Sequence, residues 1–262
     1  MNIQRVKLIY YSPTGTSAKT VKAIQSGINI NYDKIDLTLP ESELKQYSLK
    51  DTNLAIIAVP VYSGRVAPTA AKRVAKIKGQ DTPAILVAVY GNRAFEDALI
   101  ELRDLTEPNG FKVVAAGAFI GEHSFDAPST PIATGRPDVE DLEKAKEFGA
   151  RVEAKVLDIT VIPELFIPGN HPYREGGKTG GRCPETDEAI CILCGMCARV
   201  CPTGCVTVTD IVDTEIDDCT ACAACVKKCP TGARHWEHDG VLKAAKWLVT
   251  EYGDRKEPEF FF

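Results

Sequence analysis

The chain has 262 residues, 44% hydrophobic and 26% charged, which is enough for one large or two modest soluble domains with a sizeable core. Its formal net charge of -5 disfavours nucleic acid and anionic membrane surfaces as partners and leaves basic proteins as candidates. No apolar run approaches the roughly 20 residues of a membrane span, and no signal-peptide pattern precedes the first strand pattern. We therefore expect a cytoplasmic protein, in which ten cysteines indicate metal or redox chemistry rather than disulfides.

Short β-rich runs alternate with helical patterns over residues 1–158, which is typical of a parallel α/β sheet. The predicted strands are RVKLIYY, DKIDLTL, LAIIAVPVY, PAILVAVYG and FKVVAAGAFIG. Four of them are continuously apolar, as strands covered on both faces should be. Helices are predicted around residues 21–28, 95–102 and 142–156, with a short one in PESELKQYSLKD. The pattern predicts a doubly wound, five-stranded parallel sheet whose ligand lies beyond the carboxyl ends of the strands.

The stretch YYSPTGTSAKT, residues 10–20, follows the first predicted strand and precedes a helix, a placement that indicates a phosphate-binding loop. It is not a nucleotide P-loop, because Ala18 precedes Lys19, and it lacks the G-x-G-x-x-G dinucleotide fingerprint. Backbone amides at a helix start, joined by hydroxyl donors, bind a phosphate dianion without a basic side chain. The residues that would do so are Ser12, Thr14, Gly15, Thr16 and Ser17. A capped helix start without a ligand is the alternative.

Residues 159–182 carry three prolines and a cluster of glycines, which indicates a connector between domains. Beyond it, CILCGMCARVCPTG and CTACAACVKKCPTG repeat the pattern C-x2-C-x2-C-x3-C-P at 28 residues. Bacterial ferredoxins use this run for two [4Fe-4S] clusters, and the fourth cysteine of each copy ligates the other cluster. The predicted ligand sets are Cys191, Cys194, Cys197 and Cys229 for one cluster and Cys219, Cys222, Cys225 and Cys201 for the second. Structural zinc is the alternative, since C-x2-C pairs also bind zinc.

The phosphate loop resembles the FMN phosphate loop of flavodoxins, and this resemblance covers residues 1–158. Two further loops, VYSGRV and YGNRAF, follow the third and fourth predicted strands, where flavodoxins place the two walls around the isoalloxazine ring. The resemblance implies one wall made of Tyr62, Ser63, Gly64 and Arg65 and a second made of Tyr90, Gly91, Asn92 and Phe95. Arg65 and Arg93 lie in these loops and are expected to favour the anionic flavin hydroquinone.

Over nearly its whole length the chain resembles the fused flavodoxin-ferredoxin proteins of anaerobic bacteria. The resemblance implies intracellular, low-potential electron transfer, with FMN and two [4Fe-4S] clusters converting between two-electron and one-electron steps. The ferredoxin-like residues 183–239 hold ten acidic against four basic residues, which suits redox partners with basic docking patches. The alternative is an FMN-dependent NAD(P)H or quinone reductase that uses the clusters as an internal wire.

Several features stay outside these motifs. Cys183 and Cys205 are expected to be small buried hydrophobes, and His123, after the fifth predicted strand, is expected to make a structural hydrogen bond. Residues 240–262 are predicted to form a helix and a tail. The terminal EPEFFF is expected to pack on its own chain or on a second subunit of a homodimer, because three exposed phenylalanines would form an apolar patch. Docked domains, and direct electron transfer from FMN to a cluster within one chain, are therefore predicted.

Overall fold

The computed structural model describes residues 1–158, 164–176 and 180–262 of the chain. All five predicted strands are present and run parallel to one another. They are β1 (Arg5–Tyr10), β2 (Tyr32–Asp36), β4 (Asn53–Tyr62), β7 (Thr82–Tyr90) and β8 (Phe111–Ile120). Their spatial order, β2-β1-β4-β7-β8, is the 2-1-3-4-5 order of the flavodoxin-like doubly wound fold. The expected fold class is therefore confirmed.

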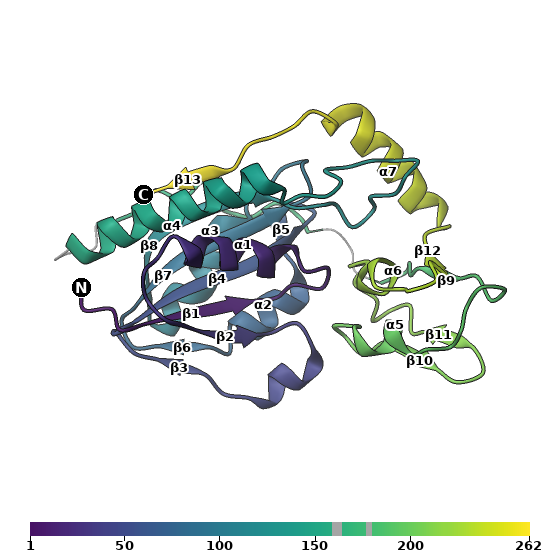
Figure 1. Ribbon diagram of the computed structural model, residues 1–262, viewed down its shortest axis with the longest axis horizontal. Coiled ribbons are helices and arrows are strands. Elements are labelled where there is room, and N and C mark those ends of the chain that lie inside the picture. Colours follow the sequence, from purple (N-terminus) through teal and green to yellow (C-terminus); the bar gives the residue numbers. More distant parts are fainter. Residues whose placement is uncertain (159–163, 177–179) are drawn as a thin grey trace.

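Helices cover both faces of this sheet (Figure 1). The helices α1 (Thr16–Ser26) and α4 (Val139–Asp158) pack on one face, and α2 (Pro68–Val74) and α3 (Ala98–Thr106) on the other. α1 and α4 approach closely because two glycines lie between them. A Cβ on Gly149 would lie 1.9 Å from the Ile24 carbonyl oxygen, and one on Gly27 would lie 2.0 Å from the Lys146 carbonyl oxygen.

Shorter elements join these layers at their edges. They are η1 (Pro40–Leu44), β3 (Ser48–Leu49), β5 (Arg65–Val66), β6 (Lys78–Gly79) and η2 (Glu107–Asn109). The 3-10 turn η1 lies where the sequence left room for only a short helix. Among the described residues, none of the helices combines the length and the apolar character that crossing a membrane requires.

The cysteine-rich part shows the 28-residue repeat in its backbone as well as in its sequence. Its elements are β9 (Glu185–Thr186), α5 (Met196–Arg199), β10 (Val206–Val208), β11 (Val212–Thr214), α6 (Ala224–Lys227) and β12 (Arg234–His235). The helices α5 and α6 occupy equivalent positions of the two copies. Before each helix, two equivalent residues have a positive φ, Leu193 and Gly195 in the first copy and Ala221 and Ala223 in the second. This conformation is costly for residues other than glycine, so its recurrence indicates that the curled backbone serves the cysteines around it.

The C-terminal segment adds a strand that the sequence did not reveal. After α7 (Asp239–Tyr252), β13 (Glu259–Phe261) pairs antiparallel with β8 and forms one edge of the sheet. The predicted sheet of five parallel strands is therefore extended by an antiparallel edge strand and by the short β5. The Phe260 ring stacks on Phe148 with 4.8 Å between centroids, so the tail packs on its own chain, which was the first of the two expected alternatives.

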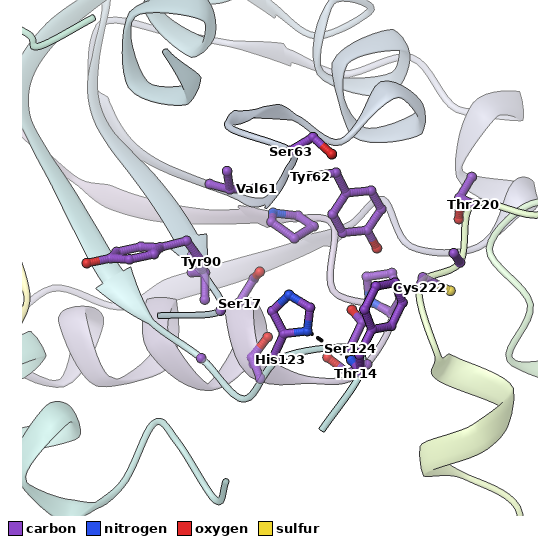
Figure 2. Close-up of a pocket in the computed structure, with 18 of the residues that line it drawn as sticks. Thr14, Ser17, Val61, Tyr62, Ser63, Tyr90, His123, Ser124, Thr220 and Cys222 are labelled. Atoms are coloured by element: carbon purple, nitrogen blue, oxygen red, sulfur yellow. Dashed lines mark hydrogen bonds between the residues drawn. The ribbon is translucent and has the colours of Figure 1, made fainter. Parts of the chain in front are cut away.

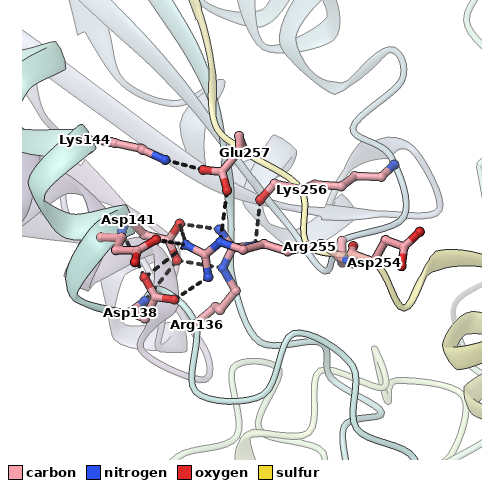
Figure 3. A network of polar contacts seen from close by, with 10 residues as sticks. Arg136, Asp138, Asp141, Lys144, Asp254, Arg255, Lys256 and Glu257 are labelled. Atoms are coloured by element: carbon pink, nitrogen blue, oxygen red, sulfur yellow. Dashed lines mark hydrogen bonds and ion pairs between the residues drawn. The ribbon is translucent and has the colours of Figure 1, made fainter.

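Polar contacts fix this segment beside the start of α4 (Figure 3). Arg255 contacts Asp138 at 2.6 Å, and the buried Arg136 forms an ion pair with Asp141. Arg136 also donates a hydrogen bond of 2.8 Å to the carbonyl oxygen of Lys256. The tail is thus anchored through both its backbone and its side chains.

Candidate functional site

A pocket that opens to solvent lies at the carboxyl ends of the strands (Figure 2). The loop after β1 and the first residues of α1 supply one wall through Thr14, Thr16 and Ser17. The Ser17 hydroxyl is fully buried and has no hydrogen-bond partner among the described residues. A buried hydroxyl without a partner, next to a helix N-terminus, indicates an anion-binding site, because the hydroxyl and the helix N-terminus would both bind the anion.

The two other residues of the predicted phosphate loop shape it from outside the pocket. The Ser12 hydroxyl accepts a hydrogen bond of 3.0 Å from the Ala18 amide. Gly15 adopts the left-handed conformation directly before α1, with φ of 95°. That conformation suits glycine and lets the chain enter the helix without a capping side chain at this position, so the amides of Thr16 and Ser17 stay available while that of Ala18 binds Ser12.

Parts of both predicted ring walls reach the pocket. Tyr62, Ser63 and Arg65 line it from the turn between β4 and β5, and Tyr90 and Gly91 line it from the end of β7. In Figure 2 the Tyr90 ring points away from Tyr62 and His123. Of these two tyrosines, Tyr62 is the one whose ring lies among the other labelled side chains.

Gly64, Asn92 and Phe95, which the resemblance placed around the flavin ring, do not line the pocket. Gly64 has a φ of 80° and serves the tight turn. The Asn92 amide donates hydrogen bonds to the carbonyl oxygens of Tyr252 and Asp254, at 2.6 and 2.8 Å. The N–H donors of the Asn92 side chain are therefore used by the C-terminal segment.

Phe95 is turned toward the same segment. Its ring lies 5.7 Å from that of Tyr90 and 6.5 Å from that of Phe261, centroid to centroid. The tail that follows α7 therefore takes the packing surface that the resemblance had assigned to the flavin. A local motif could not reveal this competition.

The arginines expected to act on the flavin both have carboxylate partners. Arg65 binds Glu101 through two hydrogen bonds of 2.8 and 2.9 Å, and Arg93 binds Glu96 in the same manner. Each positive charge is therefore largely balanced, which does not support the expectation that both act on the ring.

Arg182 is a third arginine, from the connector, and it lines the pocket. Its buried Nε has no hydrogen-bond partner within the described ranges. The residue was missed because it belongs to no motif, and only the tertiary structure places it at the strand ends. It is the arginine at this site whose charge the structure leaves available.

His123 lies on the pocket wall, although the sequence favoured a purely structural role. Its Nδ1 accepts a hydrogen bond of 3.0 Å from the Phe125 amide, so the neutral ring carries its proton on Nε2. Burial lowers the pKa of His123 to about 4, which keeps the ring neutral at pH 7. A Cβ on Gly91 would lie 2.3 Å from this ring, so the pocket needs glycine there. The wall therefore offers an N–H donor without a charge.

Two cavities in the cysteine-rich part are lined by the two predicted ligand sets. Cys201, Cys219, Cys222 and Cys225 line one. Cys191, Cys194, Cys197 and Cys229 line the other. The fourth cysteine of each motif thus lies with the first three of the other motif, as the crossed assignment requires. We call these the buried cavity and the outer cavity, because all four cysteines of the first are buried whereas Cys194 is exposed.

The donor set of both cavities fits iron-sulfur clusters, which require thiolates. Burial raises the pKa of the Cys222 thiol to about 12, so this thiol would have to lose its proton before it could bind a cluster as a thiolate. Cys205 also lines the buried cavity, and its Sγ lies 3.5 Å from that of Cys201. Within the described residues, no three His, Cys, Asp or Glu side chains converge as a single metal ion would require. A cubane is larger than one ion and needs its ligands further apart.

The pocket and the buried cavity share a wall. Thr220, Ala221 and Cys222 close the pocket from the cysteine-rich part, and Cys222 lines both spaces. Figure 2 labels Cys222 and Thr220 at the edge of the pocket that the cysteine-rich part closes. Between the two parts, Arg73 of α2 donates a hydrogen bond of 2.9 Å to the carbonyl oxygen of Pro202. A cofactor in the pocket would therefore lie against one of the predicted cluster ligands.

Comparison with known proteins agrees with this geometry. Residues 190–233 match the family model of the 4Fe-4S dicluster domain. This chain joins a flavodoxin-like domain to a ferredoxin-type 4Fe-4S domain. No curated protein matches the chain as a relative. The predicted fusion is confirmed by the strand order of the N-terminal part together with the family match of the C-terminal part.

Several solved structures resemble the N-terminal part. A flavodoxin from the domain Archaea is 16% identical, with a TM-score of 0.38, and the match covers 59% of this chain and 99% of that one. A Fusobacterium nucleatum flavodoxin bound to flavin mononucleotide is 15% identical, with a TM-score of 0.38 and coverage of 59% and 98%. Rubredoxin oxygen:oxidoreductase from the anaerobe Desulfovibrio gigas is 13% identical, with a TM-score of 0.40 and coverage of 60% and 37%. The strand order, rather than these overlaps, defines the fold.

Proposed function

We propose that this protein transfers electrons between an FMN in the pocket and two [4Fe-4S] clusters in the cavities of the same chain. The observation that carries the proposal is Cys222, which lines both the pocket and the buried cavity. Electron transfer slows steeply with distance, so a shared wall favours transfer within the chain over transfer between molecules. The flavin would exchange one or two electrons and each cluster one.

The residues of the pocket have distinct roles in this proposal. Thr14, Thr16 and Ser17 would hold the phosphate through hydroxyls and amides at the start of α1. Tyr62 would contact the ring system, with neutral His123 offering its Nε2–H from the facing wall. Thr220 and Ala221 would exclude water on the side of the buried cavity.

The outer cavity is the natural point of exchange with partners. Cys194 is exposed beside Ile192 and Leu193, which are 64% and 44% exposed. Residues 183–239 carry a formal charge of -6 before any cluster is counted. A redox protein with a basic docking patch would complement this surface. Electrons would pass from the cluster in the outer cavity to the cluster in the buried cavity and then to the flavin.

Anaerobic stopped-flow spectroscopy tests the proposal. The flavin is reduced rapidly, and the absorbance of the clusters is followed over a range of protein dilutions. We expect a first-order rate that does not depend on concentration. A rate that falls in proportion to concentration would mean transfer between molecules and would contradict the proposal. Rapid flavin bleaching by NADH or NADPH without a partner protein would instead favour the reductase alternative.

A further inference from the structure

Arg234 of β12 is one of three arginines that are buried in the described part of the chain. The other two have carboxylate partners, Glu43 for Arg73 and Asp141 for Arg136. Arg234 is only 4% exposed, yet across residues 1–158, 164–176 and 180–262 it has no carboxylate within ion-pair distance. A buried charge without a counter-charge costs several kcal/mol, so its presence needs an explanation.

The contacts of Arg234 are neutral hydrogen bonds and one sulfur. Nη1 donates to the Thr186 hydroxyl at 2.7 Å, and Nη2 donates to the Thr214 hydroxyl at 3.1 Å. Nη2 also lies 3.8 Å from the Cys225 sulfur. Nε is buried and has no partner among the described residues. The guanidinium is therefore held in place by hydrogen bonds, and its Nε–H remains unpaired among the described residues.

Arg234 lines both the buried cavity and the outer cavity. Four thiolates make a bound [4Fe-4S] cluster net anionic, and reduction adds one more negative charge. Two clusters would surround the guanidinium with the negative charge that the protein does not supply. Their sulfur atoms would also offer acceptors to the unpaired Nε.

The internal repeat provides a comparison for this position. Val206 lies 28 residues before Arg234 and is its equivalent in the first copy of the motif. It is also buried, and it begins β10 as Arg234 begins β12. An apolar side chain thus meets the packing needs of this position in one copy, and the arginine serves a different purpose in the other.

We propose that Arg234 is a counter-cation shared by the two clusters, which stabilises the reduced form of each and so sets their potentials higher than the cysteines alone would. The inference rests on the proposed function, because it presumes both clusters. The effect is larger for the cluster in the buried cavity, since Nη2 lies next to Cys225.

Substitutions in the full chain separate charge from packing. Arg234→Gln keeps hydrogen-bonding capacity and removes the charge, whereas Arg234→Lys keeps the charge. In anaerobic redox titrations followed by EPR, the Gln variant should change the reduced-to-oxidised ratio of each cluster at a fixed potential by about tenfold, a shift of about 59 mV to lower potential for a one-electron couple. The Lys variant should stay within a third of that shift.

A matched control comes from Arg199, an exposed arginine of the same domain. Arg199→Gln removes the same charge, and its smaller shift should vanish at high ionic strength because exposed charges are screened. The shift of the Arg234→Gln variant should persist in salt, as expected of a buried charge.

The outcomes are distinguishable. Wild-type protein with both clusters, but with unchanged potentials in the Gln variant, would overturn the inference and leave the proposed function standing. Wild-type protein without iron would overturn both. If the Gln variant loses its clusters and the Lys variant retains them, the inference is supported, because the charge is what Lys preserves. Loss of clusters in both variants would indicate a structural role and overturn the inference.

Discussion

The ammonium group of Lys227 lies 2.7 Å from the carboxylate of Glu122. Lys227 belongs to the second cysteine motif, and Glu122 follows the last parallel strand of the flavodoxin-like domain. The same ammonium donates to the carbonyl oxygen of Asp126 at 3.1 Å. This contact joins the cysteine-rich part, which contains Cys222, to the flavodoxin-like domain, so under the proposed function this one side chain would help to position the two for electron transfer.

Replacing Lys227 by Met should therefore slow electron transfer from flavin to cluster within the chain. The substitution removes the ion pair with Glu122 and the contacts with Asp126, and so should loosen the shared wall. The rate is measured by anaerobic stopped-flow spectroscopy. Lys228→Met is the matched control, because Lys228 is exposed and lies next in sequence. Equal rates in the two variants would show that the contact does not position the domains.

Cys222→Ala should remove the cluster of the buried cavity and lower the iron content from about eight to about four atoms per chain. The outer cavity has its own four cysteines and should keep its cluster. Cys183→Ala is the control, since Cys183 lines neither cavity. Iron and sulfide analysis of anaerobically purified protein provides the measurement. Stoichiometric zinc with little iron would instead support the zinc alternative.

Thr14→Asp should expel the flavin, because it places a carboxylate where the phosphate is expected to bind. Thr14→Ser keeps the hydroxyl and should retain the flavin. Occupancy is measured from flavin fluorescence after denaturation, and iron content shows that the clusters survive. Unchanged occupancy in the Asp variant would refute the assignment of the loop.

Arg182→Gln should make the flavin hydroquinone couple more negative. The available charge of Arg182 favours the anionic hydroquinone by on the order of 1 kcal/mol. Arg93→Gln should shift the couple less, because Glu96 keeps a second partner in Arg174. Spectroelectrochemical titration gives the midpoints. If Arg93→Gln shifted the midpoint more than Arg182→Gln, the charge that stabilises the hydroquinone would be that of Arg93, in the loop after β7.

His123 should make stability depend on pH between about 6.5 and 4. Its folded pKa, about 4, lies below the ordinary value of 6.5, so in this window the unfolded chain binds a proton that the folded chain does not. Stability therefore falls as the pH falls, by up to about 1.4 kcal/mol per pH unit. In anaerobic scanning fluorimetry, the wild-type midpoint should approach that of His123→Gln as the pH decreases. Parallel midpoints from pH 7 to 4.5 would contradict the prediction.

The sequence predicted most accurately what is set by local spacing. The five parallel strands follow from apolar runs separated by helical patterns, and the cavities agree with the cysteine sets because ligand spacing within each motif restricts the backbone. The positive φ of Ala221 and Ala223 belongs to the same local geometry.

The features that the sequence did not predict depend on distant segments. β13 has three residues and no detectable periodicity, and its place is set by pairing with β8. Asn92 and Phe95 lie in a loop that resembles a flavin wall, but both contact the C-terminal segment. Arg182 belongs to no motif, yet it lines the pocket. These outcomes depend on which of several segments occupies a surface, which local patterns do not specify.

The pairing of β13 with β8 also sets an order for biosynthesis. β8 is complete once residue 120 has been made, but one of its edges keeps unpaired N–H and C=O groups until residues 259–261 follow. Such an open edge is a template for pairing with other chains. Both cysteine motifs leave the ribosome within this interval. Until residues 259–261 are made, the part of the β8 edge at Ala116–Ala118 is therefore open to pairing with other chains, and the C-terminal strand closes it within the same chain.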